Sequence, residues 1–187
     1  MPRQGSLLER PSQIEGFVYR EEFVTPGDEL GLLERIRALE FHEMKMRGVV
    51  ARRRVLHYGV KYSFETFKAT PGPPIPEFLL PLREQAGTLA NVRPEALAEA
   101  LITEYSAGAS IGWHRDASPF GIVIGISLLS ACRFRFRRGQ VRAWETVDVP
   151  LPPRSAYVLS GSARSEWEHS IPAVKALRYS ITFRTLR

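Results

Sequence analysis

The sequence lacks the features of a secreted or membrane-spanning protein. Cys132 is the only cysteine in the 187 residues, which excludes an internal disulfide and is typical of a reducing compartment. No run approaches the ~18 apolar residues that a membrane-spanning helix needs. Residues 1–16 contain no apolar core of a signal peptide. We therefore expect a cytoplasmic protein that has no membrane partner.

Internal repeats and low-complexity segments are also absent from the sequence. The length suits a single domain over residues 1–187, and the hydrophobic content of 44% is enough for a sizeable core. We expect a monomer. Acidic residues are outnumbered, with 20 against 26 lysines and arginines, which gives a net charge of +6. This charge suits a polyanionic partner such as DNA or RNA, although many basic proteins bind nothing acidic.

The first hundred residues predict an extended arm, two helices and a strand-rich segment between them. We expect the arm over residues 1–20. Thr25 and Pro26, followed by acidic residues, predict the start of an amphipathic helix. Its apolar stripe contains Leu30, Leu33, Ile36 and Leu39 or Phe41. The remaining expectations are two short strands or a hairpin over residues 47–67 with a break at Gly59, an irregular proline-rich loop over 69–76, and a second helix over 77–87.

Short strands dominate the prediction after residue 100. Residues 121–130 form a continuous apolar run that suits a buried strand, and residues 133–138 alternate arginine with phenylalanine. Many short strands with glycine and proline turns predict a sandwich or barrel. The sequence therefore predicts an α+β fold, with helices first and a β-sandwich of jelly-roll type after them.

The last predicted strand, RYSITFR, has two unlike faces. Alternation places Tyr179, Ile181 and Phe183 on one face. The other face carries Arg178, Ser180, Thr182 and Arg184. A half-solvated surface strand is one explanation of this polar face. A buried face would need an anionic ligand to pair with its arginines.

Three residues are potential ligands of one metal ion. In an extended backbone, the side chains of His114 and Asp116 point to the same face. His169 lies 53 residues after Asp116. Two histidines and one carboxylate form the facial triad of non-haem Fe(II) oxygenases, which leaves coordination positions open. Zinc would accept the same ligands, but it does not explain the arginines. A cosubstrate such as 2-oxoglutarate does, because its far carboxylate needs a cation such as the arginine fork.

The segments HRD, EHS and RYSITFR resemble the AlkB family of Fe(II)/2-oxoglutarate-dependent dioxygenases, whose pattern is His-x-Asp, a distant His, and Arg-x-Asn-x-Thr-x-Arg. The resemblance covers about residues 45–187. It implies a double-stranded β-helix (jelly-roll) core with N-terminal helices, a catalytic core over 101–187 and a substrate lid over 45–70. It also implies Fe(II), 2-oxoglutarate and O2 as cofactors and cosubstrates.

The resemblance further implies a role for each matching residue. His114, Asp116 and His169 would ligate the iron. Tyr105 and Arg178 would hold the far carboxylate of 2-oxoglutarate, and Arg184 would face the carboxylate at the iron end. The chain departs from the family pattern at Thr103 and Ser180, where asparagine is usual, and both can still form hydrogen bonds. Some nucleic-acid repair members carry an acidic base-reading residue where this chain has Ser118.

The expected lid, RRRVLHYGVKYSF, combines positive charge with aromatic rings. Arg52 would contact phosphate, His57 would belong to the lid, and Tyr58, Tyr62 and Phe64 would stack on an extruded base. Alternatively, these rings pack the hairpin onto the core and the arginines are solvated. A second arginine set is either a phosphate track or a solvated sheet face: Arg133, Arg135, Arg137, Arg138 and Arg142.

Three functions of different classes follow from these features. The first is a dioxygenase that oxidatively demethylates alkylated bases in DNA or RNA, as in DNA repair, and releases formaldehyde. The second keeps this chemistry but hydroxylates modified tRNA bases, a protein or a small molecule. The third is a basic β-sandwich without catalytic activity that binds nucleic acid.

Overall fold

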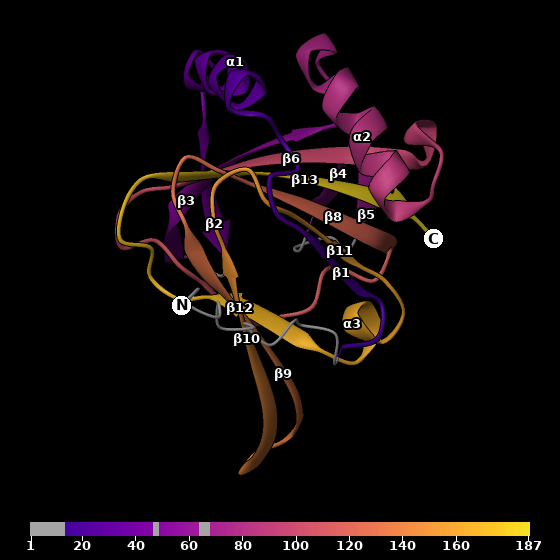
Figure 1. Cartoon of the computed structure of the whole chain (residues 1–187), viewed down its shortest axis with the longest axis vertical. Helices are drawn as coiled ribbons and strands as arrows, with labels where there is room; N and C mark the ends of the chain where they lie inside the picture. The colour runs from indigo at the N-terminus through magenta and orange to yellow at the C-terminus, as the bar shows by residue number, and fades with distance from the viewer. Residues whose placement is uncertain (1–13, 47–48, 64–67) are drawn as a thin grey trace, which may run out of the picture.

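A seven-stranded and a four-stranded antiparallel sheet form the body of the protein in the computed structural model, which describes residues 14–46, 49–63 and 68–187 (Figure 1). The large sheet has the order β1 (Phe17–Arg20), β11 (Ala156–Leu159), β8 (Phe120–Leu128), β13 (Arg178–Leu186), β6 (Leu97–Tyr105), β3 (Val49–Tyr58) and β2 (His42–Met46). The small sheet has the order β10 (Ala143–Leu151), β9 (Cys132–Gln140), β12 (Glu168–Ile171) and β7 (Ile111–His114). A separate hairpin pairs β4 (Val60–Ser63) with β5 (Lys68–Pro71).

Two α-helices lie on the outer face of the large sheet (Figure 1). These are α1 (Pro26–Arg37) and α2 (Leu80–Ala90); the 3-10 helices η1 (Glu77–Leu79) and η2 (Pro94–Ala96) flank α2, and α3 (Gly161–Ser165) precedes β12. The predicted start of the first helix is confirmed, because the Thr25 hydroxyl accepts a hydrogen bond from the Asp28 amide at 3.1 Å. At the end of α2, Asn91 adopts the left-handed conformation that commonly ends a helix.

The hydrophobic core has two parts, one on each face of the large sheet. On the outer face, side chains of α1 and α2 such as Ile36 and Leu82 pack against Ile126 and Phe183 of the sheet. Between the two sheets, the other part contains Phe134, Phe136, Trp167 and Leu159. Apolar side chains therefore cover part of the inner face of the large sheet, and other positions of this face border a cavity.

The predicted fold class, an α+β protein with a jelly-roll or double-stranded β-helix core, is confirmed. The expected order with helices first holds only in part, because β1 precedes α1 and the strands β2 to β5 lie between α1 and α2. Within the described ranges, no helix has the length and apolar character needed to cross a membrane. The alternation predicted over residues 132–138 is also confirmed, since Phe134 and Phe136 are buried and Arg133 is exposed. β9 and β10 form a long hairpin that projects from the body of the molecule (Figure 1).

Several local predictions need correction. Leu30 is 58% exposed, because α1 turns Leu32, Leu33 and Ile36 toward the sheet instead. Of the two alternatives for this segment, its described residues form two strands, β3 and β4, which meet at Gly59. They are not hairpin partners, since β3 pairs with β2 and β6. The expected irregular loop begins with strand residues, because β5 extends to Pro71 at an edge where proline removes no sheet hydrogen bond.

The expected N-terminal arm and the second helix also differ in detail. Residues 17–20 of the arm form β1, which pairs with β11, whereas residues 1–13 lie outside the described residues. The second helix begins as the 3-10 helix η1 and continues as α2 to Ala90. Pro81, in the first turn of α2, is compatible with this start because its missing amide hydrogen has no helical partner there.

We predict that Ile126→Ala lowers the free energy of unfolding by about 2–5 kcal/mol, because it leaves a cavity in the core under the helices. Ile126 is fully buried, whereas Val141 at the tip of the β9–β10 hairpin is 80% exposed. Val141→Ala is therefore the control and should change stability by less than about 0.5 kcal/mol. Urea unfolding measures both variants. Equal losses in the two would contradict this description of the core.

Candidate active site

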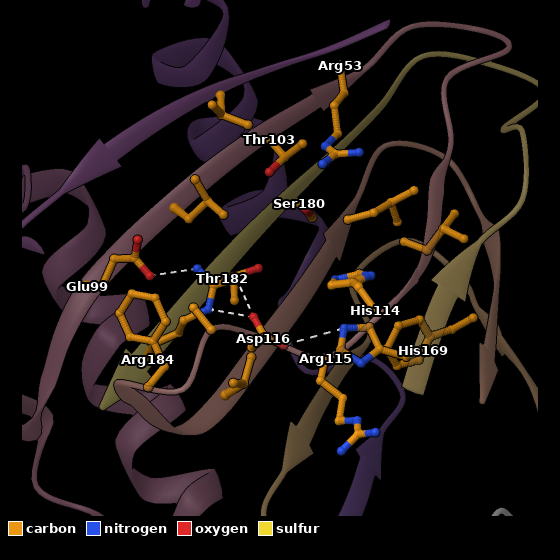
Figure 2. A pocket seen from close by; sticks show the side chains of 18 of the residues that line it. Arg53, Glu99, Thr103, His114, Arg115, Asp116, His169, Ser180, Thr182 and Arg184 are labelled. Carbon is orange, nitrogen blue, oxygen red and sulfur yellow. Dashed lines mark hydrogen bonds and ion pairs between the residues drawn. The ribbon is translucent and has the colours of Figure 1, made fainter. Parts of the chain in front are cut away.

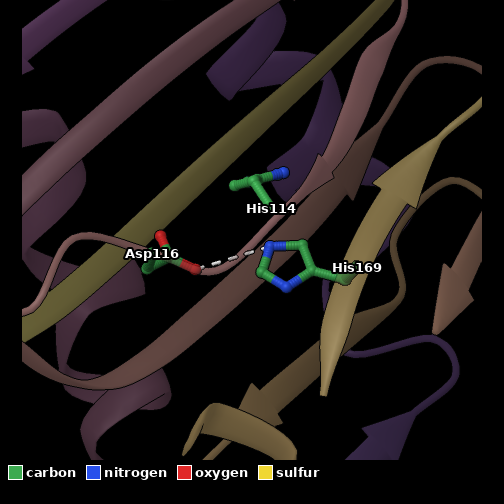
Figure 3. A group of neighbouring side chains, drawn as sticks. All are labelled: His114, Asp116 and His169. Carbon is green, nitrogen blue, oxygen red and sulfur yellow. Dashed lines mark ion pairs between the residues drawn. The ribbon is translucent and has the colours of Figure 1, made fainter. Parts of the chain in front are cut away.

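Two strands of the small sheet and the loop after one of them bring His114, Asp116 and His169 together (Figure 3). His114 ends β7 and lies opposite His169 of β12 in the sheet register, and Asp116 follows two residues after His114. One potential ligand atom from each residue lies within 4.8 Å of the others. His169 Nε2 is 3.4 Å from Asp116 Oδ2. The geometry is that of a site where one metal ion could be held.

The protonation states of these groups suit metal binding, which needs neutral imidazoles and an ionised carboxylate. His114 Nδ1 lies 2.8 Å from the Gly112 carbonyl oxygen, which only accepts, so Nδ1 carries the proton and Nε2 keeps its lone pair. Burial lowers the pKa of His114, and it lowers the pKa of His169 to about 3. Burial alone would raise the pKa of Asp116, but Arg184 and the histidines outweigh it and hold that pKa well below its usual range.

A chain of buried ion pairs connects Asp116 to the large sheet (Figure 2). Arg184 of β13 lies 2.8 Å through Nε and 2.6 Å through Nη2 from Asp116 Oδ1. Its Nη1 donates to Glu99 Oε2 at 2.6 Å. The other oxygen of Glu99 accepts from His57 Nδ1 at 2.9 Å. Glu99 is fully buried and has two partners, as a buried carboxylate requires.

The inner face of the large sheet presents ordered rows of side chains to the cavity (Figure 2). Each row follows the pairing of neighbouring strands. The four rows are Arg53, Tyr105 and Arg178; Val55, Thr103, Ser180 and Ser127; His57, Leu101, Thr182, Gly125 and Tyr157; and Glu99, Arg184 and Val123. All of these residues except Ser127 and Gly125 line the cavity. Polar side chains thus follow β13 along its inner face from Arg178 to Arg184, as the alternation of the sequence predicts.

Arg178 is a buried cation that has no carboxylate partner among the described residues. Its side chain is 1% exposed, its Nε donates to Ser127 Oγ at 3.2 Å, and its guanidinium lies 5.0 Å from the centre of the Tyr105 ring. Its Nη1 has no hydrogen-bond partner in the described part of the chain. Because an uncompensated buried charge is costly, this end of the cavity is suited to an anion.

The cavity has a volume of about 260 Å³ and joins Arg178 to the three potential metal ligands. Both sheets contribute to its wall, with Phe134, Ile171 and Val123 among the apolar residues. A 2-oxo diacid can therefore reach a metal at one end and Arg178 at the other. The donor set, the unpartnered guanidinium nitrogen and the enclosed space fit Fe(II) and 2-oxoglutarate.

The structure brings most of the predicted site residues to this cavity but not all of them. Thr103, Tyr105, Ser180, His57 and Tyr62 line it together with the three potential ligands and the two arginines. Tyr58 instead packs against the core under the helices. Ser118 is exposed and is not among the lining residues. Phe64 and the side chain of Arg52 lie outside the described residues.

Several residues of this region were not singled out from the sequence, among them Arg53, Glu99 and Tyr157, which line the cavity, and Ser127, which accepts the hydrogen bond from Arg178. Glu99 could have been found, because it alternates with Leu101, Thr103 and Tyr105 on one face of a strand. Arg53 likewise lies at the next position after Arg52, and its Nη1 donates to the Ser110 carbonyl at 3.2 Å. Ser127 and Tyr157 lie in apolar strands whose two faces the sequence does not distinguish.

The arginines of the β9–β10 hairpin mostly have acidic partners. Arg133 lies 3.4 Å from Asp148, and Arg137 lies 2.6 Å from Glu168. Arg138 bonds both Glu145 and Glu166, at 2.9 and 3.1 Å. Arg135 donates to Ser170 and stacks on Trp113, and Arg142 is exposed. This arrangement matches the solvated sheet face more closely than a phosphate track.

Comparison with known proteins agrees with this geometry. The family model described as the 2OG-Fe(II) oxygenase superfamily matches residues 20–184. An Arabidopsis thaliana protein named "Alkylated DNA repair protein ALKBH8 homolog" is 30% identical over an alignment of 192 positions, which covers 89% of this chain and 54% of that protein. The mouse "tRNA (carboxymethyluridine(34)-5-O)-methyltransferase ALKBH8" is 28% identical over 83% of this chain and 24% of its own length. The chain thus spans about half or less of these two relatives.

A solved structure of OsALKBH1 superimposes with a TM-score of 0.71 at 17% sequence identity. The match covers 91% of this chain and 96% of the other. At this level of identity, the similarity supports the shared fold.

We predict that the metal-free protein loses stability as the pH falls from about 6.5 toward 3. The unfolded chain protonates His169 near its ordinary pKa of 6.5, whereas the folded chain does so only near 3. The unfolded state therefore binds more protons in this window, and stability rises with pH there. Urea unfolding with a chelator, at pH 7 and pH 5, measures the loss. His169→Gln should reduce the difference between the two pH values, and an unchanged difference would contradict the assignment.

Proposed function

Because this chain belongs to the 2OG-Fe(II) oxygenase superfamily and is an AlkB-type dioxygenase that depends on Fe(II) and 2-oxoglutarate, we propose that it oxidises a C–H bond on a modified base of DNA or RNA. The leading candidate is oxidative demethylation of an alkylated base. The observation that carries the proposal is the unpartnered Arg178 guanidinium nitrogen, which shares one cavity with His114, Asp116 and His169.

Each residue of the site has a proposed role. His114, Asp116 and His169 hold Fe(II), and Arg184 fixes the orientation of the Asp116 carboxylate. Arg178 and Tyr105 bind the far carboxylate of 2-oxoglutarate, with Thr103 and Ser180 beside them on neighbouring strands. When bound, the iron and its cosubstrate supply the oxidising power for O2 chemistry. The apolar residues of the wall, such as Phe134 and Ile171, would limit the contact of this site with water.

The substrate side of the site is formed by strands from the expected lid. His57 of β3 and Tyr62 of β4 line the cavity, and the Tyr62 ring lies 6.1 Å from that of Phe120. An aromatic ring and a polar group at the cavity wall are what an extruded base needs for stacking and recognition. The net charge of +6 favours a polynucleotide partner. The name of the Arabidopsis relative, which refers to alkylated DNA, also supports this class.

Hydroxylation of a modified tRNA base is the second candidate. The mouse relative and a Xenopus tropicalis relative that is 29% identical over 86% of this chain are both named for action on carboxymethyluridine in tRNA. The position of the attacked carbon separates the two outcomes. A hydroxylated N-methyl group collapses to formaldehyde and leaves the base, whereas a hydroxyl on a carbon-bound group remains.

We predict that Arg178→Met weakens 2-oxoglutarate binding by about 30-fold or more, because removing one partner of a buried charge pair costs 2–5 kcal/mol. Anaerobic titration of the Fe(II) protein, followed by the charge-transfer absorption of the bound 2-oxo acid, measures the affinity. Arg54→Met is the matched control, since Arg54 is 48% exposed and pairs with Glu104 on the opposite face of the sheet. His114→Ala should abolish the absorption band. Normal affinity in Arg178→Met would refute the cosubstrate site.

The substrate proposal is tested with a panel scored by mass spectrometry. The panel contains single-stranded DNA and RNA with N-methylated bases, and tRNA anticodon stem-loops with modified uridines. We expect loss of a methyl group together with formaldehyde for demethylation, or gain of one oxygen for hydroxylation, with no reaction in His114→Ala. Succinate release that is stimulated only by peptides or metabolites would overturn the nucleic-acid assignment while leaving the oxygenase chemistry intact.

A further inference from the structure

Tyr157 is a polar residue in the cavity wall that the roles given above do not use. It lies on β11 opposite Gly125 of β8, and its ring lies directly over that glycine. A Cβ atom at Gly125 would be 2.2 Å from Tyr157 Cζ and 2.4 Å from its hydroxyl oxygen. The missing side chain of Gly125 therefore makes room for the phenol and brings its hydroxyl across β8 toward the next strand.

Tyr157 belongs to a row of the inner face that lies between the rows of Arg178 and Arg184. Gly125 pairs with Thr182, which lies one inward position from Arg184 along β13. Ser127 is the next inward-facing residue after Gly125 on β8, on the side toward Arg178, and it accepts the hydrogen bond from Arg178. A diacid that extends from Arg178 toward Asp116, the partner of Arg184, would therefore cross the row that contains Tyr157.

Tyr157 is suited to be a fixed hydrogen-bond donor. Its ring stacks on Phe134 with 4.6 Å between ring centres and an interplanar angle of 27°, which holds the phenol in place. Burial raises the pKa of Tyr157 well above its usual value, and the nearby Asp116 and Tyr105 raise it further. The phenol therefore stays protonated and can donate to an anion, with less ordering required than for a flexible side chain.

The 2-oxo acid end of the cavity needs an additional donor. Arg184 is the cation at this end, but its Nε and Nη2 are already bonded to Asp116 and its Nη1 to Glu99. These contacts use three of the five N–H groups of the Arg184 guanidinium, so only two remain for another ligand. Thr103 and Ser180 have short polar side chains, and they lie one row closer to Arg178 than Tyr157 does.

We propose that the Tyr157 hydroxyl donates a hydrogen bond to the 2-oxo acid end of bound 2-oxoglutarate and thereby shares with Arg184 the task of orienting it. This inference rests on the oxygenase family and the assigned cosubstrate site, and it is independent of the nucleic-acid substrate. The alternative role of Tyr157 is packing alone, because an aromatic ring that covers a glycine on a neighbouring strand stabilises a sheet.

The test is Tyr157→Phe, which keeps the ring over Gly125 and removes only the hydroxyl. Anaerobic titration of the Fe(II) protein should show about a tenfold loss of affinity for 2-oxoglutarate, the size expected for a hydrogen bond to a charged group. Pyruvate retains the 2-oxo acid end and lacks the second carboxylate, so its affinity should fall by a similar factor. The charge-transfer band should also shift in wavelength, which packing alone would not cause. Fe(II) affinity and the melting temperature should stay unchanged.

Tyr19→Phe is the matched control, because Tyr19 pairs with Tyr157 in the sheet but is not among the residues that line the cavity. It should bind both 2-oxo acids like the unmodified protein. Unchanged affinity in Tyr157→Phe overturns the proposal, and so does a loss that affects 2-oxoglutarate but not pyruvate. An equal loss in Tyr19→Phe overturns it as well. No nucleic acid is used, so a negative result in the substrate panel has no bearing on this outcome.

Discussion

The ion pair between Arg184 and Asp116 is the contact on which the site depends, because it joins the two sheets across the cavity. Asp116 belongs to the loop after β7 of the small sheet, and Arg184 belongs to β13 at the centre of the large one. Both groups are almost completely buried, and the second carboxylate on Arg184, from Glu99, leaves no excess positive charge at this point. Removing one residue of such a buried network destabilises a protein far more than losing a surface ion pair does. The same contact also sets the direction in which Asp116 presents its other oxygen to a metal.

The division of labour between the faces of β13 explains how a small protein can hold both a core and a polar site. Tyr179, Ile181 and Phe183 point to the helices and belong to the hydrophobic core. Ser180, Thr182 and the two arginines point to the cavity. Because side chains alternate with a period of two, a shift of one residue in the register of β13 would exchange these faces. Packing of the core therefore fixes the positions of the binding groups.

The sequence predicted the chemistry of the site better than it predicted the contacts around it. The spacing of His114 and Asp116 and the alternation of RYSITFR point to a shared inward face through local geometry alone. His169 could be associated with them only through a composition typical of metal sites and a family resemblance, because its position depends on sheet pairing over long range. Tyr58 shows the limit of such reasoning, since its place on the outer face of β3 follows from the register with β6. Tyr157 was missed for the related reason that its short apolar strand does not reveal which face will border a cavity, whereas the alternation of Glu99 with Thr103 and Tyr105 was a usable signal.

The β9–β10 hairpin has a practical consequence that follows from its shape. Its tip projects from the body of the molecule, and Val141 at that tip is almost fully exposed (Figure 1). Loop tips of this kind tolerate added chemical groups, because few packed contacts depend on them. The tip is therefore a suitable attachment point for a fluorophore or a surface tether, through which the molecule could be immobilised with its interior undisturbed.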